Sequence, residues 1–348
     1  MENLKVGWTS PSNIALVKYW GKVPVQIPAN PSISFTLSES KTSMTVFVSP
    51  SNKKEVDVDF YFEGELNEKF KTKIVKFLET EVERFPWLEE FHLAINSENT
   101  FPHSSGIASS ASSMSALTLC LLSLDEKITG HTLLLEDFFR EASDLSRKAS
   151  GSASRSIYPI LATWGEIDDL PETSNLFASP IKKTEIHESF RKFCDAILIV
   201  DAGEKSVSSR AGHALMDNHP FAIERFKRAR HNLTRLLAAM RAGDMNTFIE
   251  VVEEEALMLH SLMMTSTPSY ILLKPTSLLL IEKIREFRAK TNIPVCFTID
   301  AGPNIHLLYP AEFRTDVHQW LKSELVDLKV VQNIIYDEVG MGPERIKD

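Results

Sequence analysis

A run of small polar residues is the first candidate for chemistry in this chain. Residues 102–112 read Pro-His-Ser-Ser-Gly-Ile-Ala-Ser-Ser-Ala-Ser, and a largely apolar stretch, Met114 to Leu124, follows directly. Small side chains let a ligand approach the backbone, and the apolar stretch predicts a buried helix. The first N–H groups of a helix lack internal partners and carry positive potential, so the run is suited to binding phosphate. Serine is also a common N-cap residue, so composition alone fits an ordinary core helix equally well.

Two cations and two aromatic residues lie together in the segment Lys18-Tyr19-Trp20-Gly21-Lys22. In an extended segment, Lys18, Trp20 and Lys22 would share one side. Lysine suits phosphate because its ammonium is a compact point charge. Taken alone, however, the segment is better interpreted as a solvated strand end with one buried tryptophan, since lysines are usually exposed.

Two arginines follow runs of small residues. Arg155 comes after Ser150-Gly151-Ser152-Ala153-Ser154, and Arg210 comes after Ser208-Ser209. A guanidinium can hold a carboxylate with two parallel hydrogen bonds, which lysine cannot do. A surface arginine at a helix end is the alternative for Arg155, and Ser-Ser-Arg alone is a weak signal.

Asp300 lies in a predicted turn between two apolar strands, 295–299 and 305–309. The residues after it, Ala301 and Gly302, leave space for a ligand beside the carboxylate. Aspartate is also common in turns, where its side chain hydrogen-bonds the local backbone. Asp201 likewise ends a predicted strand, and we interpret it as structural.

Hydrophobic periodicity predicts the elements that would position these residues. Alternation at 44–48 and 56–62, with a polar stretch between, predicts an antiparallel hairpin. Helical patterns are found at 70–78, 107–124, 133–149, 220–242, 246–263 and 276–290, and a short strand at 196–200. Strands followed by runs of helices, without regular βαβ alternation, indicate an α+β fold.

Bulk properties narrow the functional class. The chain has 348 residues, 43% hydrophobic and 24% charged, which is typical of a soluble globular protein with two domains or one large one. A net charge of −9 argues against nucleic-acid binding. The three cysteines show no disulfide or metal spacing, and Cys120 and Cys296 fit a core. Residues 1–6 lack a signal-peptide core and the apolar runs are too short to span a membrane, so we expect a cytoplasmic protein without membrane contact.

The Ser-rich run resembles the phosphate-binding loop of the GHMP kinase superfamily, where Pro-x-x-x-Gly-Leu-Ala/Gly-Ser-Ser-Ala opens a helix. Further segments resemble its mevalonate diphosphate decarboxylase branch, in the family's order and over nearly the whole chain: 13–22, 150–156, 207–212 and 300–304. The resemblance implies an N-terminal domain like ribosomal protein S5 domain 2 (1–182), a C-terminal α+β domain (183–348), and an active site in the cleft between them.

The resemblance also implies residue roles. Asp300 is the catalytic carboxylate beside the substrate's tertiary hydroxyl, Lys18 lies near that hydroxyl and the transferred phosphate, and Arg155 binds the substrate carboxylate. Other substrate-binding positions are Ala15, Tyr19, Trp20, Lys22, Ser150, Ser152, Ser209, Arg210 and Ala301. The nucleotide site comprises Ser104, Ser105, Gly106, Ala108, Ser109, Ser110 and Ser112, with Ser110 as a ligand for Mg²⁺. His103-Ser104-Ser105 departs from the family's Thr-Ala-Ala, which adds polarity beside the phosphates.

The implied activity is ATP- and Mg²⁺-dependent decarboxylation of mevalonate 5-diphosphate to isopentenyl diphosphate. Alternatives of the same fold are a decarboxylase for the 5-monophosphate and a kinase that stops after phosphorylating the 3-hydroxyl. A non-catalytic ligand sensor would not need Asp300, Lys18 and Arg155 together. The motif match to Glu255 and His260 implies an architectural role for both. For the oligomeric state of the protein, we consider a homodimer.

Overall fold

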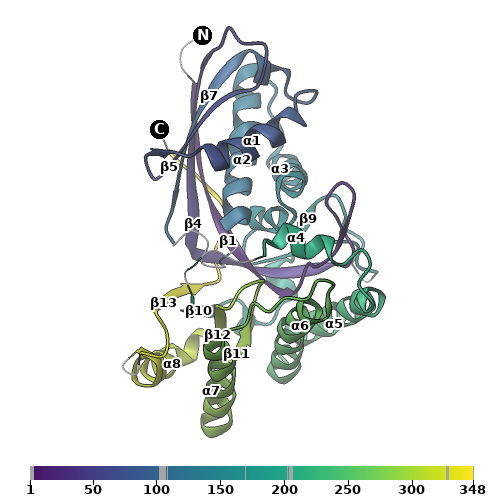
Figure 1. Ribbon diagram of the computed structural model, residues 1–348, viewed down its shortest axis with the longest axis vertical. Coiled ribbons are helices and arrows are strands. Elements are labelled where there is room, and N and C mark those ends of the chain that lie inside the picture. The colour runs from purple at the N-terminus through teal and green to yellow at the C-terminus, as the bar shows by residue number, and fades with distance from the viewer. Residues whose placement is uncertain are drawn as a thin grey trace.

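Two layered regions, connected by long strands, make up the chain (Figure 1). The computed structural model describes residues 4–101, 107, 109–168, 170–201, 203, 207–326 and 329–347. In Figure 1 the helices α1–α3 lie in the upper region, the helices α5–α8 lie in the lower one, and α4 lies between them. This is the α+β class that the sequence predicts.

The larger sheet has the order β14-β1-β4-β7-β5-β6, and β8 and β9 extend it from β4. β4 pairs with β7 through its second half and with β8 through its first four residues, so one strand serves both regions. β1 follows β4 antiparallel, with register shifts at Pro11/Asn13 and Ala15/Val17. The strands of this sheet are β1 (Leu4–Val17), β4 (Ser32–Pro50), β5 (Asp57–Phe62), β6 (Glu65–Leu66), β7 (Phe91–Asn99), β8 (Leu161–Trp164), β9 (Ala178–Pro180) and β14 (Glu344–Arg345).

The predicted hairpin at 44–62 is wrong in its pairing. Both strands form, and the alternating residues face the core as expected. However, β7 lies between β4 and β5, and it pairs antiparallel with β4 and parallel with β5. The connection from β5 to β7 runs through a helix, so this part of the sheet contains one βαβ crossover.

The predicted helices are confirmed to within a few residues. α1 (Glu68–Glu79) begins at an N-cap, Asn67, whose side chain accepts from the Phe70 N–H, and it buries Ile74, Phe77 and Leu78. α2 is buried on nearly all sides, because it lies against the sheet and against other helices. This explains why its sequence is largely apolar rather than amphipathic. The remaining helices are α2 (Ser109–Thr129), α3 (Leu135–Ala149), α4 (Ser209–Ala214), α5 (Ala222–Ala242), α6 (Met245–Thr265), α7 (Pro275–Thr291) and α8 (Arg314–Leu321). No described helix is long and apolar enough to cross a membrane.

The smaller sheet carries the turn that contains Asp300. Its order is β11-β12-β10-β13, and β11 and β12 form the antiparallel pair predicted on either side of that turn. Its strands are β10 (Phe193–Ile199), β11 (Cys296–Thr298), β12 (Ile305–Pro310) and β13 (Asn333–Glu338). A short ladder of β2 (Lys22–Val23) with β3 (Ile27–Pro28) follows the end of β1.

The two regions are held together by shared strands and helices. β14, at the C-terminal end, pairs with β1 in the larger sheet, so the chain returns to the region in which it begins. α6 contacts both β1 of the larger sheet and β11 of the smaller one. The domain boundary between 182 and 183 stays a prediction. Cys120, Cys194 and Cys296 are all buried and free.

Candidate active site

A buried ion pair joins two segments that lie 282 residues apart. Lys18, directly after β1, places Nζ 2.8 Å from Oδ1 of Asp300, in the turn between β11 and β12. The Lys18 side chain is 2% exposed, whereas that of Asp300 is 26% exposed. Burial lowers the pKa of Lys18, and the negative charge of Asp300 opposes this shift. The pair therefore offers a buried cation and a carboxylate that a ligand can still reach.

The burial of Lys18 overturns the interpretation of residues 18–22 as a solvated strand end. β1 stops at Val17, and Gly21 has a positive φ of 96°, so the segment is not extended. Lys18 is buried, while Lys22 at the start of β2 is half-buried, and its Nζ lies 2.6 Å from Oε1 of Gln26 in the turn that joins β2 to β3. The two lysines therefore differ in burial.

Arg155 is buried beside this pair. It lies in the 3₁₀ helix Gly151–Ile157 and is 2% exposed. Nε donates to Oγ of Ser34 at 2.9 Å and Nη1 to Oγ of Ser32 at 2.6 Å, and Nη2 lies 3.4 Å from Oδ1 of Asn13. Burial lowers its pKa to about 10, and the charge of Asp300 counteracts this. Neutral hydroxyls orient the guanidinium without cancelling its charge, which suits the capture of an anion.

Sequence reasoning missed the residues that hold Arg155. Ser32 and Ser34 are fully buried, and they begin a run of β4 in which every second residue up to Thr42 is polar. Such alternation is typical of a strand with one face in solvent, so the sequence did not single out these two serines as buried partners of an arginine. Asn13, on the neighbouring β1, was not singled out either.

Tyr19 and Trp20 enclose a buried histidine. The His213 ring centroid lies 4.3 Å from that of Tyr19 and 4.6 Å from that of Trp20, and Nδ1 accepts from the Gly21 N–H. Burial, with a smaller contribution from Lys22, lowers the pKa of His213 to about 3, so the ring is uncharged. The described residues offer no hydrogen-bond partner to the buried Tyr19 hydroxyl. Burial also raises the pKa of Tyr19, which therefore remains a hydrogen-bond donor.

α4 is held against Trp20 by close packing. A Cβ at Gly212 would lie 2.6 Å from the Trp20 ring, so only glycine fits there. Ser208 caps the helix by accepting from the Ala211 N–H, and the predicted Ser209 is exposed at its start. The backbone of Arg210 lies in this helix, and its side chain lies outside the described part.

The start of α2 carries the described part of the predicted nucleotide site. Ser110 is exposed, with its hydroxyl 3.5 Å from that of Ser150. Ser109 is half-buried, whereas Ser112 is fully buried and its Oγ lies 2.7 Å from Oγ1 of Thr42 on β4. Ser112 thus lies in the interface between the helix and the sheet. The predicted residues Ser104, Ser105, Gly106 and Ala108 lie outside the described residues.

The remaining predicted residues lie close to these groups. Ala15 is buried in β1, and its carbonyl accepts from Oγ1 of Thr298 beside Asp300. The carbonyl of Ser152 accepts from the Asn13 side chain that also contacts Arg155. Ala301 is buried in the same apolar cluster as Trp20. Among the described residues, no three His, Cys, Asp or Glu side chains form a metal cluster.

Asp201 belongs to the support of the turn rather than to the ion pair. Oδ1 of Asn304 accepts from the N–H groups of Val200 and Asp201, and its Nδ2 donates to the Asp201 carbonyl. The Asp201 side chain itself accepts from the Gly203 N–H. These contacts fit the structural role predicted for Asp201.

Family models match most of the chain. The diphosphomevalonate decarboxylase-like N-terminal domain matches residues 10–175, and the mevalonate 5-diphosphate decarboxylase C-terminal domain matches residues 196–342. A diphosphomevalonate decarboxylase of Eremothecium gossypii is 31% identical over 87% of this chain and 77% of its own length. That of Debaryomyces hansenii is 29% identical over 97% of this chain and 93% of its own.

Solved structures match the fold over its whole length. The mevalonate diphosphate decarboxylase from Staphylococcus aureus has a TM-score of 0.82 and 29% identity, covering 99% of this chain and 98% of that one. A structure described as "MDDEF in complex with MVAPP, AMPPCP and Magnesium" has a TM-score of 0.83 and 27% identity, covering 99% and 100%.

Proposed function

The chain belongs to the diphosphomevalonate decarboxylase family, and from this we propose how its buried residues carry out the reaction. Its fold is the GHMP kinase fold. The reaction is the ATP-dependent decarboxylation of mevalonate 5-diphosphate, which yields isopentenyl diphosphate, CO₂, ADP and phosphate. The roles of individual residues, given below, are our proposals.

Asp300 accepts the proton of the substrate's 3-hydroxyl as the hydroxyl oxygen attacks the γ-phosphorus of ATP. The observation that carries this role is the buried Lys18–Asp300 pair at 2.8 Å. The neighbouring ammonium orients the carboxylate, and it provides positive charge where the phosphoryl group is transferred. Phosphoryl transfer depends mostly on positioning and on charge stabilisation, which a carboxylate paired with a buried ammonium supplies.

Arg155 binds the substrate's carboxylate. After phosphorylation, the C3–O bond breaks and its electron pair leaves with phosphate, so positive charge develops at C3. The C–C bond to the carboxylate then breaks, its electrons form the new double bond, and CO₂ departs. The hydroxyls of Ser32 and Ser34 fix the guanidinium plane, and therefore the direction from which the carboxylate is held.

The diphosphate end of the substrate is bound by Tyr19, Lys22, Ser209 and Arg210. The buried Tyr19 hydroxyl supports this, because a buried donor without a protein partner is costly unless a ligand supplies the acceptor. Ala15, Trp20 and Ala301 are buried around the mevalonate moiety, and the half-buried Ser150 and Ser152 complete that part of the site.

ATP and Mg²⁺ are required for the reaction. We assign the nucleotide phosphates to the start of α2 and the preceding loop, residues 104–112. The hydroxyls of Ser110 and Ser150 are oxygen donors 3.5 Å apart, a donor type that Mg²⁺ accepts together with ATP phosphate oxygens. When bound, Mg²⁺ neutralises the charge on the phosphates.

A substrate comparison tests this function. CO₂ release and ADP formation are measured with mevalonate, its 5-phosphate and its 5-diphosphate. We expect both products in equal amounts with the 5-diphosphate, and a kcat/KM about 10- to 150-fold lower with the monophosphate, since at least one charge-assisted contact is lost. ADP without CO₂ would identify a 3-kinase, and an equal or higher kcat/KM with the monophosphate would identify a phosphomevalonate decarboxylase.

A homodimer and a cytoplasmic location stay predictions from the sequence.

A further inference from the structure

One helix contacts the backbone of both members of the Lys18–Asp300 pair. On α6, Oε2 of Glu255 accepts from the Lys18 N–H at 3.0 Å. Five positions further along the same helix, Nε2 of His260 lies 3.1 Å from the Asp300 carbonyl oxygen, to which it donates. Glu255 is fully buried and His260 is 2% exposed. The segments before β2 and after β11 are thus both tied to α6.

A buried arginine on α5, Arg225, contacts both Glu255 and the backbone of Lys18. Nη1 and Nη2 of Arg225 donate to the two carboxylate oxygens of Glu255, each at 2.8 Å. Nη2 also donates to the Lys18 carbonyl at 3.0 Å, as does Nδ2 of Asn30. The N–H and the C=O of Lys18 are therefore both fixed by side chains, and two of these bonds involve charged groups.

Stability alone is a weak reason to bury such a pair. Moving an arginine and a glutamate out of water costs about as much as their attraction returns, so a well-packed apolar pair is often at least as stable. What the charged pair provides is a rigid, directional fit around one residue. Its side chains face the backbone of Lys18, and the negative charge of Glu255 also counteracts the lowering of the Lys18 pKa, so the pair acts on the reaction through Lys18.

We propose that Glu255, Arg225 and His260 are positioning residues, which set the alignment of the Lys18 ammonium with the Asp300 carboxylate through the two backbones. This inference rests on the proposed roles of Lys18 and Asp300. The three residues contact the backbones of the pair, so their loss misplaces the reacting groups and leaves the other ligand-binding side chains in place. The expected signature is a lower kcat with nearly unchanged KM values for ATP and mevalonate 5-diphosphate.

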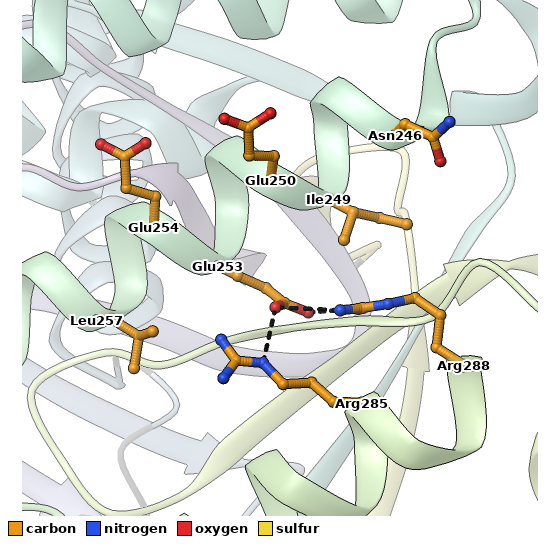
Figure 2. A pocket seen from close by; sticks show the side chains of 8 residues that line it. All are labelled: Asn246, Ile249, Glu250, Glu253, Glu254, Leu257, Arg285 and Arg288. Atoms are coloured by element: carbon orange, nitrogen blue, oxygen red, sulfur yellow. Dashed lines mark hydrogen bonds and ion pairs between the residues drawn. The ribbon is translucent and has the colours of Figure 1, made fainter. Parts of the chain in front are cut away.

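The same helix carries a matched control on another face. Glu253, two residues before Glu255, is also buried and also paired with arginines, Arg285 and Arg288 of α7. Figure 2 shows these contacts at a surface hollow of about 480 Å³, lined on the α6 side by Asn246, Ile249, Glu250, Glu254 and Leu257. Glu253→Gln therefore removes a similar buried charge from α6 without touching the support of Lys18.

A second control matches His260. His219 is 7% exposed, and its Nε2 lies 3.0 Å from the Leu262 carbonyl, which is also on α6. Like His260, it is a buried histidine hydrogen-bonded to a backbone carbonyl, but its partner is not part of the catalytic pair. His219→Leu and His260→Leu consequently both remove a bond of this type, and His219→Leu also removes the acceptor of the Phe221 N–H.

The test is steady-state kinetics of the full chain with ATP, Mg²⁺ and mevalonate 5-diphosphate, together with thermal unfolding. We expect Glu255→Gln and His260→Leu to lower kcat by about 10- to 100-fold with KM values within about threefold, because small misplacements are that costly. His260→Gln, whose amide nitrogen can still donate to the Asp300 carbonyl, restores most of the lost kcat. Glu253→Gln and His219→Leu lower Tm by a similar amount but keep kcat within about twofold.

Several outcomes would overturn the proposal. These are a wild-type kcat in both His260→Leu and Glu255→Gln, an equal fall in the two controls, or no difference between His260→Gln and His260→Leu. If Glu255→Gln does not fold, the three histidine variants decide alone. Asp300→Asn is measured in parallel: if it stays active, the proposed catalytic role has failed, and if it is inactive while the His260 and Glu255 variants behave as wild type, only the positioning inference has failed.

Discussion

The two ends of the active site are built in opposite ways. At the proposed reacting end, Lys18 and Arg155 are each 2% exposed, and their charged groups already have partners within the protein. At the proposed phosphate end, Ser110 and Ser209 are exposed at the first turns of α2 and α4. The cations of the first end are buried and prearranged, whereas the two serines of the second are open to water.

The difference follows from where charge changes during the reaction. Burying a cation is costly, but a fixed charge in a water-free site stabilises a transition state far better than one in solvent. That cost is justified at the C3 hydroxyl and the carboxylate, where bonds break. The diphosphate of the substrate is bound without reacting, and helix N-termini and hydroxyls can bind phosphate while remaining hydrated. Substitutions at the reacting end should therefore affect kcat, and those at the phosphate end should affect affinity.

The largest effect is expected from Asp300→Asn. This change keeps the size of the side chain but removes the proton acceptor and leaves the buried Lys18 ammonium without its counter-charge. We expect kcat to fall by about 10²–10⁴-fold with ATP still bound, as is usual when a general base is removed. Asp201→Asn is the control, since Asp201 also follows a strand but is 43% exposed and supports the turn. More than about a tenth of wild-type kcat in Asp300→Asn would contradict the assigned role.

Arg155→Lys should be the next most damaging change, although it preserves the charge. An ammonium cannot contact Ser32, Ser34 and a substrate carboxylate in the planar geometry of the guanidinium. We expect kcat to fall by about 10²-fold, with ATP affinity nearly unchanged. Direct nucleotide binding and single-turnover CO₂ release measure the two quantities separately. Normal turnover would mean that the buried guanidinium is only part of the core.

Much of this organisation can be predicted from the sequence. The helices α1, α2, α3, α5, α6 and α7 were each visible from their apolar period, and the turn around Asp300 from its flanking strands. The pairing of β4 and β5 was not, because alternation shows which face of a strand is buried but not which strand lies beside it. In the structure β7, which begins 29 residues after β5 ends, takes the place between them.

The features of the candidate site likewise divide into those that the sequence predicts and those that it does not. Asp300, Lys18 and Arg155 could be selected by motif, but the burial of Lys18 could not, because it depends on a partner 282 residues away. The bonds from Glu255 and Arg225 to Lys18 were also invisible, since they come from two helices in the second half of the chain. Long-range polar contacts leave no periodic pattern, and Ser32 and Ser34 were not distinguished from the other alternating Ser and Thr residues of β4.

At the phosphate end, Ser110→Leu should weaken ATP binding and spare the other substrate. The leucine would fill space at the start of α2 and remove a hydroxyl that lies 3.5 Å from that of Ser150. We expect about 10- to 100-fold weaker ATP binding with mevalonate 5-diphosphate still bound, since one charge-assisted bond and close approach are lost. Ser110→Ala separates these causes, because it removes only the hydroxyl. Unchanged ATP affinity in Ser110→Leu would contradict the nucleotide assignment, and equal loss of both ligands would indicate misfolding.

The smallest effect should come from Arg210→Ala. This variant sharpens the contrast between the two ends of the site, because its effect depends on whether the substrate carries a diphosphate or a monophosphate. Arg210 lies in the first turn of α4, which Gly212 packs against Trp20. A guanidinium can bridge two phosphate oxygens, so its removal should lower kcat/KM for the 5-diphosphate about tenfold more than for the 5-monophosphate. Arg241, exposed at the end of α5, gives the control. Arg241→Ala should leave kcat/KM unchanged for both the 5-diphosphate and the 5-monophosphate. If Arg210→Ala lowered the two values equally, Arg210 would supply only general attraction, and discrimination would have to come from Tyr19 and Lys22 at the edge of the buried half.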